Sequence, residues 1–88
     1  MNPHILMVID NQINPDKYTL DELKANAEAA DANANTDTAY VEAYAACAAC
    51  ADTYAAAADA DYWLNEYFNY SGENKQDYID AINKLTTK

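Results

Sequence analysis

The chain has 88 residues, of which 15 are acidic and five are basic, and it carries a formal net charge of −10. A chain of this length forms one small domain, residues 1–88, and its charge opposes direct binding to nucleic acid or to an anionic membrane. It has no apolar stretch of the ~20 residues that span a membrane, no basic leader segment and no disulfide framework, so we expect a soluble intracellular protein.

The first predicted helix begins next to the amino terminus. Asn2 followed by Pro3 is typical of an N-cap and a first helical residue. Apolar side chains then recur at helical spacing: Ile5, Leu6, Ile9 and Ile13. The pattern predicts a short helix from residue 3 to about residue 12, ended by Asn14 and Pro15.

The next predicted element is a long helix rich in alanine. Thr19 and Glu22 form a capping-box pattern, and the chain from Leu20 to Tyr70 contains neither glycine nor proline. Half of residues 25–60 are alanine, the best helix former. The short polar side chains at 33–38 favour turns. The sequence therefore allows either one helix of about fifty residues or two helices, 20–33 and 38–70.

A short helix is predicted at the carboxyl-terminal end. Ser71 and Gly72 close the long segment, with Gly72 in the left-handed conformation. Asn74 then caps a helix that extends to about Leu85 and has Asp77 in its first turn. The predicted fold is thus all-α, with a short, a long and a short helix arranged as a helical bundle or a helical oligomer.

The long segment combines small side chains with tyrosines. If it is one helix, a single stripe contains, in order, Tyr40, Tyr44, Cys47, Ala51, Tyr54, Ala58 and Tyr62. This stripe has two interpretations: a packing face, or a row of exposed tyrosine anchors for a partner. Because alanine methyl groups contribute little on burial, the stem must pack against other helices or a second copy, and we expect a homo-oligomer.

Acidic residues dominate the same segment. Nine carboxylates and no basic residue lie between Lys24 and Lys75, which predicts a protein partner with a basic surface. The most regular acids, Asp52, Asp59 and Glu66, are spaced seven apart. The candidate partner-binding residues are Asp52, Asp59, Glu66, Asp61, Glu42, Tyr54 and Tyr62.

Residues with possible chemistry are few. Cys47 and Cys50 have CxxC spacing, but zinc requires further ligands, of which His4 is the sole candidate, and a reactive thiol requires a helix N-terminus. We interpret the cysteines as small core residues and His4 as a solvent-facing side chain. Ser71, the single serine, has no histidine near it in sequence. We therefore expect no enzymatic activity, cofactor or metal.

The two ends of the chain, NPDKYTLDELKAN and YWLNEYFNYSGENKQDYIDAI, flank a middle rich in Ala, Asp and Tyr. In this the chain resembles small accessory proteins of unassigned function encoded by tailed bacteriophages. The resemblance implies a small helical protein that most often modifies a host or phage macromolecule. We expect a non-enzymatic protein of the host cytoplasm that binds and inhibits a host macromolecule. The alternative is a structural or assembly component, such as a virion accessory protein.

Some proteins of this kind present a DNA-like array of carboxylates. As a straight helix, residues 28–66 span roughly 57 Å and carry eight acids, or about one charge per 7 Å. One strand of duplex DNA has about one charge per 3.4 Å. On this estimate, DNA mimicry requires an oligomer.

Overall fold

The computed structural model describes residues 2–50 and 54–86, without the side chains of 54–58 and 85–86. This part of the chain is helical, and its elements are α1 (Pro3–Ile13), α2 (Leu20–Ala32), α3 (Asp37–Ala49), α4 (Tyr54–Ser71) and α5 (Lys75–Thr86). The predicted all-α fold is confirmed.

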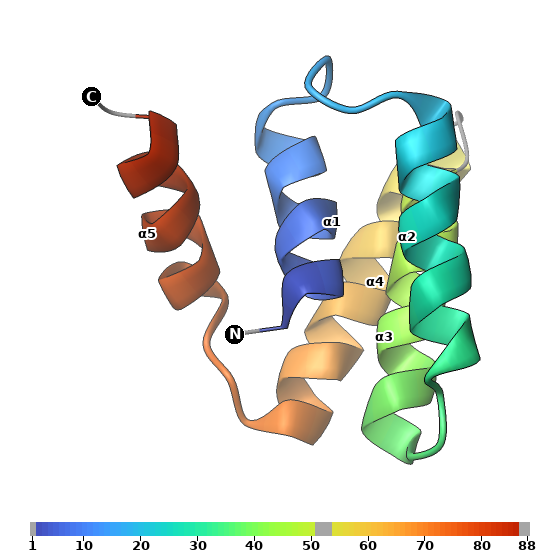
Figure 1. Cartoon of the computed structure of the whole chain (residues 1–88). Helices are drawn as coiled ribbons and strands as arrows, with labels where there is room; N and C mark the ends of the chain where they lie inside the picture. The colour runs from blue at the N-terminus through green and yellow to red at the C-terminus, as the bar shows by residue number, and fades with distance from the viewer. Residues whose placement is uncertain (1, 51–53, 87–88) are drawn as a thin grey trace.

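Helix α3 is the centre of the bundle. It packs against α1, α2 and α4, and its contact with α4 is the most extensive between any two helices. Helices α2, α3 and α4 run alternately up and down, while α1 lies between α2 and α5 (Figure 1). The alanine-rich segment therefore folds back and packs against itself, and the apolar helix α1 packs against it.

Side-chain caps define where three of the helices begin. The Asn2 side chain accepts hydrogen bonds from the backbone N–H groups of His4 and Ile5 at 2.9 and 3.2 Å. The capping box of α2 is confirmed, because Glu22 N donates to Thr19 Oγ1 at 3.1 Å and Thr19 N donates to Glu22 Oε1 at 3.0 Å. Thr36 caps α3. Of the two alternatives for the polar stretch at 33–38, the break is therefore correct.

The prediction of one helix over residues 38–70 is wrong. Helix α3 ends at Ala49, with Cys50 as its C-cap, and α4 begins at Tyr54 and runs back along α3 (Figure 1). Neither glycine nor proline marks this reversal. A straight rod would leave its alanine methyl groups in water, whereas the packing of α4 against α3 buries them, and this gain outweighs the helix propensity that favours one long helix.

The core joins side chains from all of the helices. Its largest fully buried members are Ile5, Val8, Ile9, Leu64, Tyr78 and Ile82. Alanines of α2 and α3 complete the cluster: Ala27, Ala30, Ala43, Ala45 and Ala46. The alanine-rich stem thus packs against other helices of the same chain, which was one of the two arrangements expected for it.

A buried carboxylate closes the connection between α1 and α2. Asp10 is 4% exposed and accepts hydrogen bonds from Lys17 Nζ and Tyr18 Oη, each at 2.6 Å, and from Asn14 Nδ2 at 2.8 Å. Burial alone would raise the pKa of Asp10, but these hydrogen bonds and the Lys17 charge hold it below its ordinary value. The pair with Lys17 is the single ion pair recorded within residues 2–50 and 54–86.

The connection between α4 and α5 agrees with its sequence signals. Gly72 has a φ of +75°, as expected for a left-handed helix end, and Gln76 N donates to Asn74 Oδ1 at 2.8 Å at the start of α5. Among the described helices, none combines the length and apolar character needed to cross a bilayer.

Candidate functional site: an acidic and aromatic surface

The outward face of α4 combines acidic and aromatic side chains. Ala60, Leu64 and Tyr67 are buried and fix the face of the helix that points to the core. At about 100° per residue, Tyr62 falls opposite the core, and Asp59 and Glu66 fall on one flank, roughly 110–130° from the core direction. Asp59 is exposed, Glu66 is half-buried, and Tyr62 is 55% exposed.

A cluster of three aromatic rings joins this face to α3. The ring centroid of Trp63 lies 4.8 Å from that of Tyr44 on α3 and 4.9 Å from that of Tyr62. Tyr44 and Tyr40, one turn apart on α3, are 52% and 51% exposed. Trp63 is half-buried and packs against the core. We refer to Tyr40, Tyr44, Asp59, Tyr62, Trp63 and Glu66 as the α3–α4 surface.

In the described part of the chain, no ion pair involves the carboxylates of this surface. Neither Asp59 nor Glu66 lies within ion-pair distance of an ammonium group in the described part of the chain. The sequence has no basic residue between Lys24 and Lys75, so neither α3 nor α4 supplies one. The surface therefore presents unneutralised negative charge beside exposed π faces.

The structure separates the candidate partner-binding residues into groups. Asp59, Tyr62 and Glu66 share the α3–α4 surface. Asp61, although it is exposed, lies on another side of α4 and accepts a hydrogen bond at 2.7 Å from Gln12 of α1. Asp52 lies outside the described residues, and Tyr54 begins α4 without a described side chain.

Glu42 requires a correction. We expected it on the acidic outside of the stem, but it is 6% exposed, and Asn2 Nδ2 donates a hydrogen bond to its Oε1. Burial raises the pKa of Glu42, an effect that nearby Glu73 reinforces and nearby His4 opposes. Glu42 faces the interior because α3 is the central helix, packed against three others, and not one side of an isolated rod.

Sequence reasoning missed Trp63 and left Tyr40 and Tyr44 out of the candidate site. The two tyrosines were recognised as members of a helical stripe, but their place beside Trp63 depends on the reversal between α3 and α4. The available signal was the sequence Tyr62-Trp63 between two acids of the same helix face. A partly exposed tryptophan next to an exposed tyrosine is typical of an interface.

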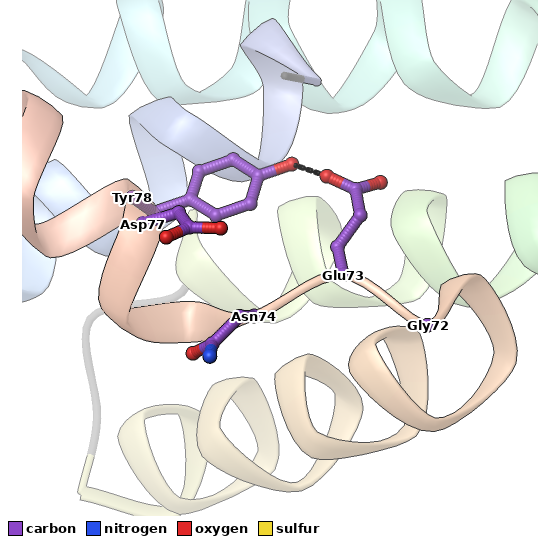
Figure 2. Close-up of a pocket in the computed structure, with 5 residues that line it drawn as sticks. All are labelled: Gly72, Glu73, Asn74, Asp77 and Tyr78. Atoms are coloured by element: carbon purple, nitrogen blue, oxygen red, sulfur yellow. Dashed lines mark hydrogen bonds between the residues drawn. The ribbon is translucent and has the colours of Figure 1, made fainter.

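A second polar cluster joins the amino terminus to the α4–α5 connection. Tyr67 Oη donates to Glu73 Oε2 at 2.5 Å. Tyr78 Oη donates to Glu73 Oε1, the bond drawn in Figure 2. Tyr78 Oη in turn accepts from Asn2 N at 2.9 Å. Burial opposes ionisation of Glu73, but the two tyrosine hydrogen bonds hold its pKa below the ordinary value. Burial and the bond to Glu73 raise the pKa of both tyrosines.

A depression of about 270 Å³ lies beside this cluster. It is lined by Gly72, Glu73, Asn74, Asp77 and Tyr78. Figure 2 shows the Tyr78 hydroxyl directed at the Glu73 carboxylate, while the Asn74 and Asp77 side chains point elsewhere. Because both Glu73 oxygens accept hydrogen bonds from tyrosines, we interpret this cluster as a clamp between helices.

Comparison of the chain with family models, curated proteins and solved structures finds no match. The interpretation of the site therefore depends on its own geometry and charge.

The expectation that the cysteines are small core residues is wrong for Cys47, whereas Cys50 is partly buried and packs against the core. They lie at the carboxyl-terminal end of α3, where Cys47 is exposed and Cys50 is half-buried. Burial raises the pKa of the Cys47 thiol, and Cys50 and Asp31 reinforce this shift, so the thiol is not activated. Within residues 2–50 and 54–86, no three potential ligands converge on a metal position.

The expectation for His4 was also wrong. The side chain is half-buried, and its Nδ1 lies 2.9 Å from Asn26 Oδ1. Asn26 Nδ2 donates back to His4 O at 3.2 Å, so the two residues connect α1 to α2. The His4 side chain points inward because the buried side-chain amide of Asn26 on α2 lies within hydrogen-bond distance of its ring.

Proposed function

We propose that this chain is a non-enzymatic protein-interaction module that binds a basic surface of a partner protein through its α3–α4 surface. The observation that carries the proposal is the juxtaposition of exposed, contacting aromatic rings with unneutralised Asp59 and Glu66. Aromatic residues supply binding energy at the centres of interfaces, and unpaired carboxylates steer a basic partner toward them.

The net charge of the chain indicates which class of macromolecule this surface binds. The net charge of −10 repels phosphate groups, so nucleic acids and anionic membranes are poor ligands for this surface. A protein that presents lysine or arginine is the electrostatic complement. We propose that a host protein whose basic surface normally binds nucleic acid is such a partner.

A single copy does not present the charge density of a DNA strand on one face. The longest dimension of the fold is 37 Å, and a DNA strand of that length carries about eleven charges, at one per roughly 3.4 Å. The α3–α4 surface carries Asp59 and Glu66, whereas Asp10 and Glu42 are buried and Asp61 lies on another side of α4. DNA mimicry therefore still requires an oligomer, as the estimate for a straight helix also indicated.

Association remains a prediction, although the packing of the alanine stem no longer requires it. The reason to expect a homo-oligomer was that the alanine stem needed a packing partner, and the buried alanines of α2 and α3 find one within the chain. Sedimentation equilibrium will measure the oligomeric state directly. The proposed role is inhibition of a host macromolecule in the host cytoplasm, which follows from the resemblance to phage accessory proteins.

Trp63 provides the experiment, because it is the single tryptophan of the chain and belongs to the α3–α4 surface. Its fluorescence is followed during titration with a basic peptide and with an uncharged peptide of the same length. We expect saturable binding of the basic peptide alone, weakening as added salt shortens the Debye length from about 10 Å at 0.1 M to about 3 Å at 1 M.

A matched pair of variants separates local from overall charge. Asp59→Asn with Glu66→Gln removes two charges from the surface, and we expect affinity to fall about tenfold. Asp16→Asn with Glu28→Gln also removes two negative charges, but at exposed positions outside α3 and α4. The loss of affinity should be much smaller in this variant. Equal losses, or binding that ignores salt, would refute the proposed surface and favour the structural role.

A further inference from the structure

We infer that the α3–α4 surface recognises arginine in preference to lysine, so that its occupant is an arginine-bearing segment of a partner protein. The inference rests on the proposed function and makes it more specific. The guanidinium group stacks on the exposed tyrosine rings while its N–H groups donate to Asp59 or Glu66.

The spacing of α4 places a carboxylate on each side of the rings. Asp59 precedes Tyr62 by three residues and Trp63 by four, and Glu66 follows them by four and three. Side chains three or four residues apart on a helix are neighbours, with Cβ atoms about 5–6 Å apart. A side chain that lies on the rings is therefore within reach of either carboxylate.

The rings are held in position before any partner arrives. Trp63 packs against the core, and its ring contacts Tyr44 at an interplanar angle of 34° and Tyr62 at 83°. Tyr44 and Tyr62 are each more than half exposed, so π surface is open to solvent. Since the rings already contact one another, binding costs little side-chain entropy.

The chemistry of this arrangement favours a guanidinium over an ammonium group. Guanidinium is planar and weakly hydrated, and it can stack on a ring while its edge donates to a carboxylate. An ammonium ion is compact and strongly hydrated, so it gains less from the rings. A second copy of this chain is a poor occupant, because it contains no arginine and would oppose like charges.

The test compares two peptides of equal length and equal charge, one with arginine and one with lysine as the basic residue. Affinities are measured by isothermal titration calorimetry, which does not depend on the aromatic residues that are changed. We expect the arginine peptide to bind the unchanged protein at least about threefold more tightly. The variant Tyr44→Ala with Tyr62→Ala should lose that preference and retain salt-sensitive binding of both peptides.

The control is Leu20→Ala, because Leu20 is 48% exposed and lies at the start of α2, outside α3 and α4. It should keep the preference for arginine. Equal affinities for the two peptides, or a preference that survives in the double tyrosine variant, would overturn the inference and leave the charge-led function intact. Failure of both peptides to bind the unchanged protein would instead overturn the proposed function. Circular dichroism establishes that each variant is folded.

Discussion

Replacing Glu42 by glutamine should stabilise the protein at neutral pH. The carboxylate is 6% exposed, and one side-chain donor, Asn2 Nδ2, is recorded for it. That donor is fixed in direction, because the Asn2 Oδ1 atom caps α1 by accepting from His4 N and Ile5 N. Glutamine at position 42 keeps an oxygen for Asn2 and removes the buried charge.

The sign of the effect follows from the raised pKa of Glu42. Because the fold favours the protonated carboxyl group, the associated stability is present below the ordinary value of 4.5 and is lost as pH rises through the folded pKa. Glu42→Gln should therefore match the unchanged protein at acidic pH and exceed it at pH 7. Relief of a partly desolvated charge is worth about 1 kcal/mol here, equivalent to a rise in Tm of roughly 4–8 °C for a small domain.

Thermal unfolding followed by circular dichroism from acidic to neutral pH measures this difference. Glu28→Gln, at an exposed position of α2, is the matched control and should change stability by less than about 0.5 kcal/mol. Glu42→Ala should be destabilising by about 1–3 kcal/mol, since it leaves the Asn2 amide without its acceptor. A Glu42→Gln protein that is less stable than the original at pH 7, or a gain that is independent of pH, would refute this reasoning.

Two further predictions concern stability. Asp10→Asn should cost about 2 kcal/mol at pH 7 by disrupting charge-assisted hydrogen bonds at the end of α1, whereas Asp16→Asn, exposed in the same connection, should be nearly neutral. Since the pKa of Asp10 is lowered in the fold, the stability that Asp10 contributes is present above the ordinary value of 3.8 and is lost as pH falls below it. The pH of acid unfolding should therefore change in Asp10→Asn and stay the same in Asp16→Asn. Replacing both Cys47 and Cys50 by alanine should cost less than about 1 kcal/mol in a denaturant titration, and stoichiometric zinc in the purified protein would contradict that expectation.

Local signals in the sequence predicted much of the fold. The N-cap at Asn2, the capping box at Thr19 and the left-handed Gly72 each depend on a few adjacent residues, and each is found as expected. The reversal after Cys50 has no such signal, because it arises from long-range packing of α4 on α3. Helix propensity alone therefore extends the alanine-rich helix too far.

The candidate site was predictable only in part for the same reason. Asp59, Tyr62 and Glu66 lie on one helix, so their spacing was sufficient to place the two acids on a flank beside the stripe that contains Tyr62. Tyr44 comes from another helix, and its contact with Trp63 could not be read from spacing. We expected Glu42 on the outside because the prediction treated its helix as an isolated rod. In the fold, α3 packs against three other helices and Glu42 is buried.

The buried alanines of the hairpin have a consequence for how this surface can change over evolutionary time. Ala45 and Ala46 are fully buried on α3, and Ala60 is buried on α4. Methyl side chains let packed helices lie close together, whereas a leucine at such a position would displace a neighbouring helix and disturb the contact of Tyr44 with Trp63. A homologue could thus keep every exposed residue of the α3–α4 surface and still lose its ring contacts through one substitution behind it.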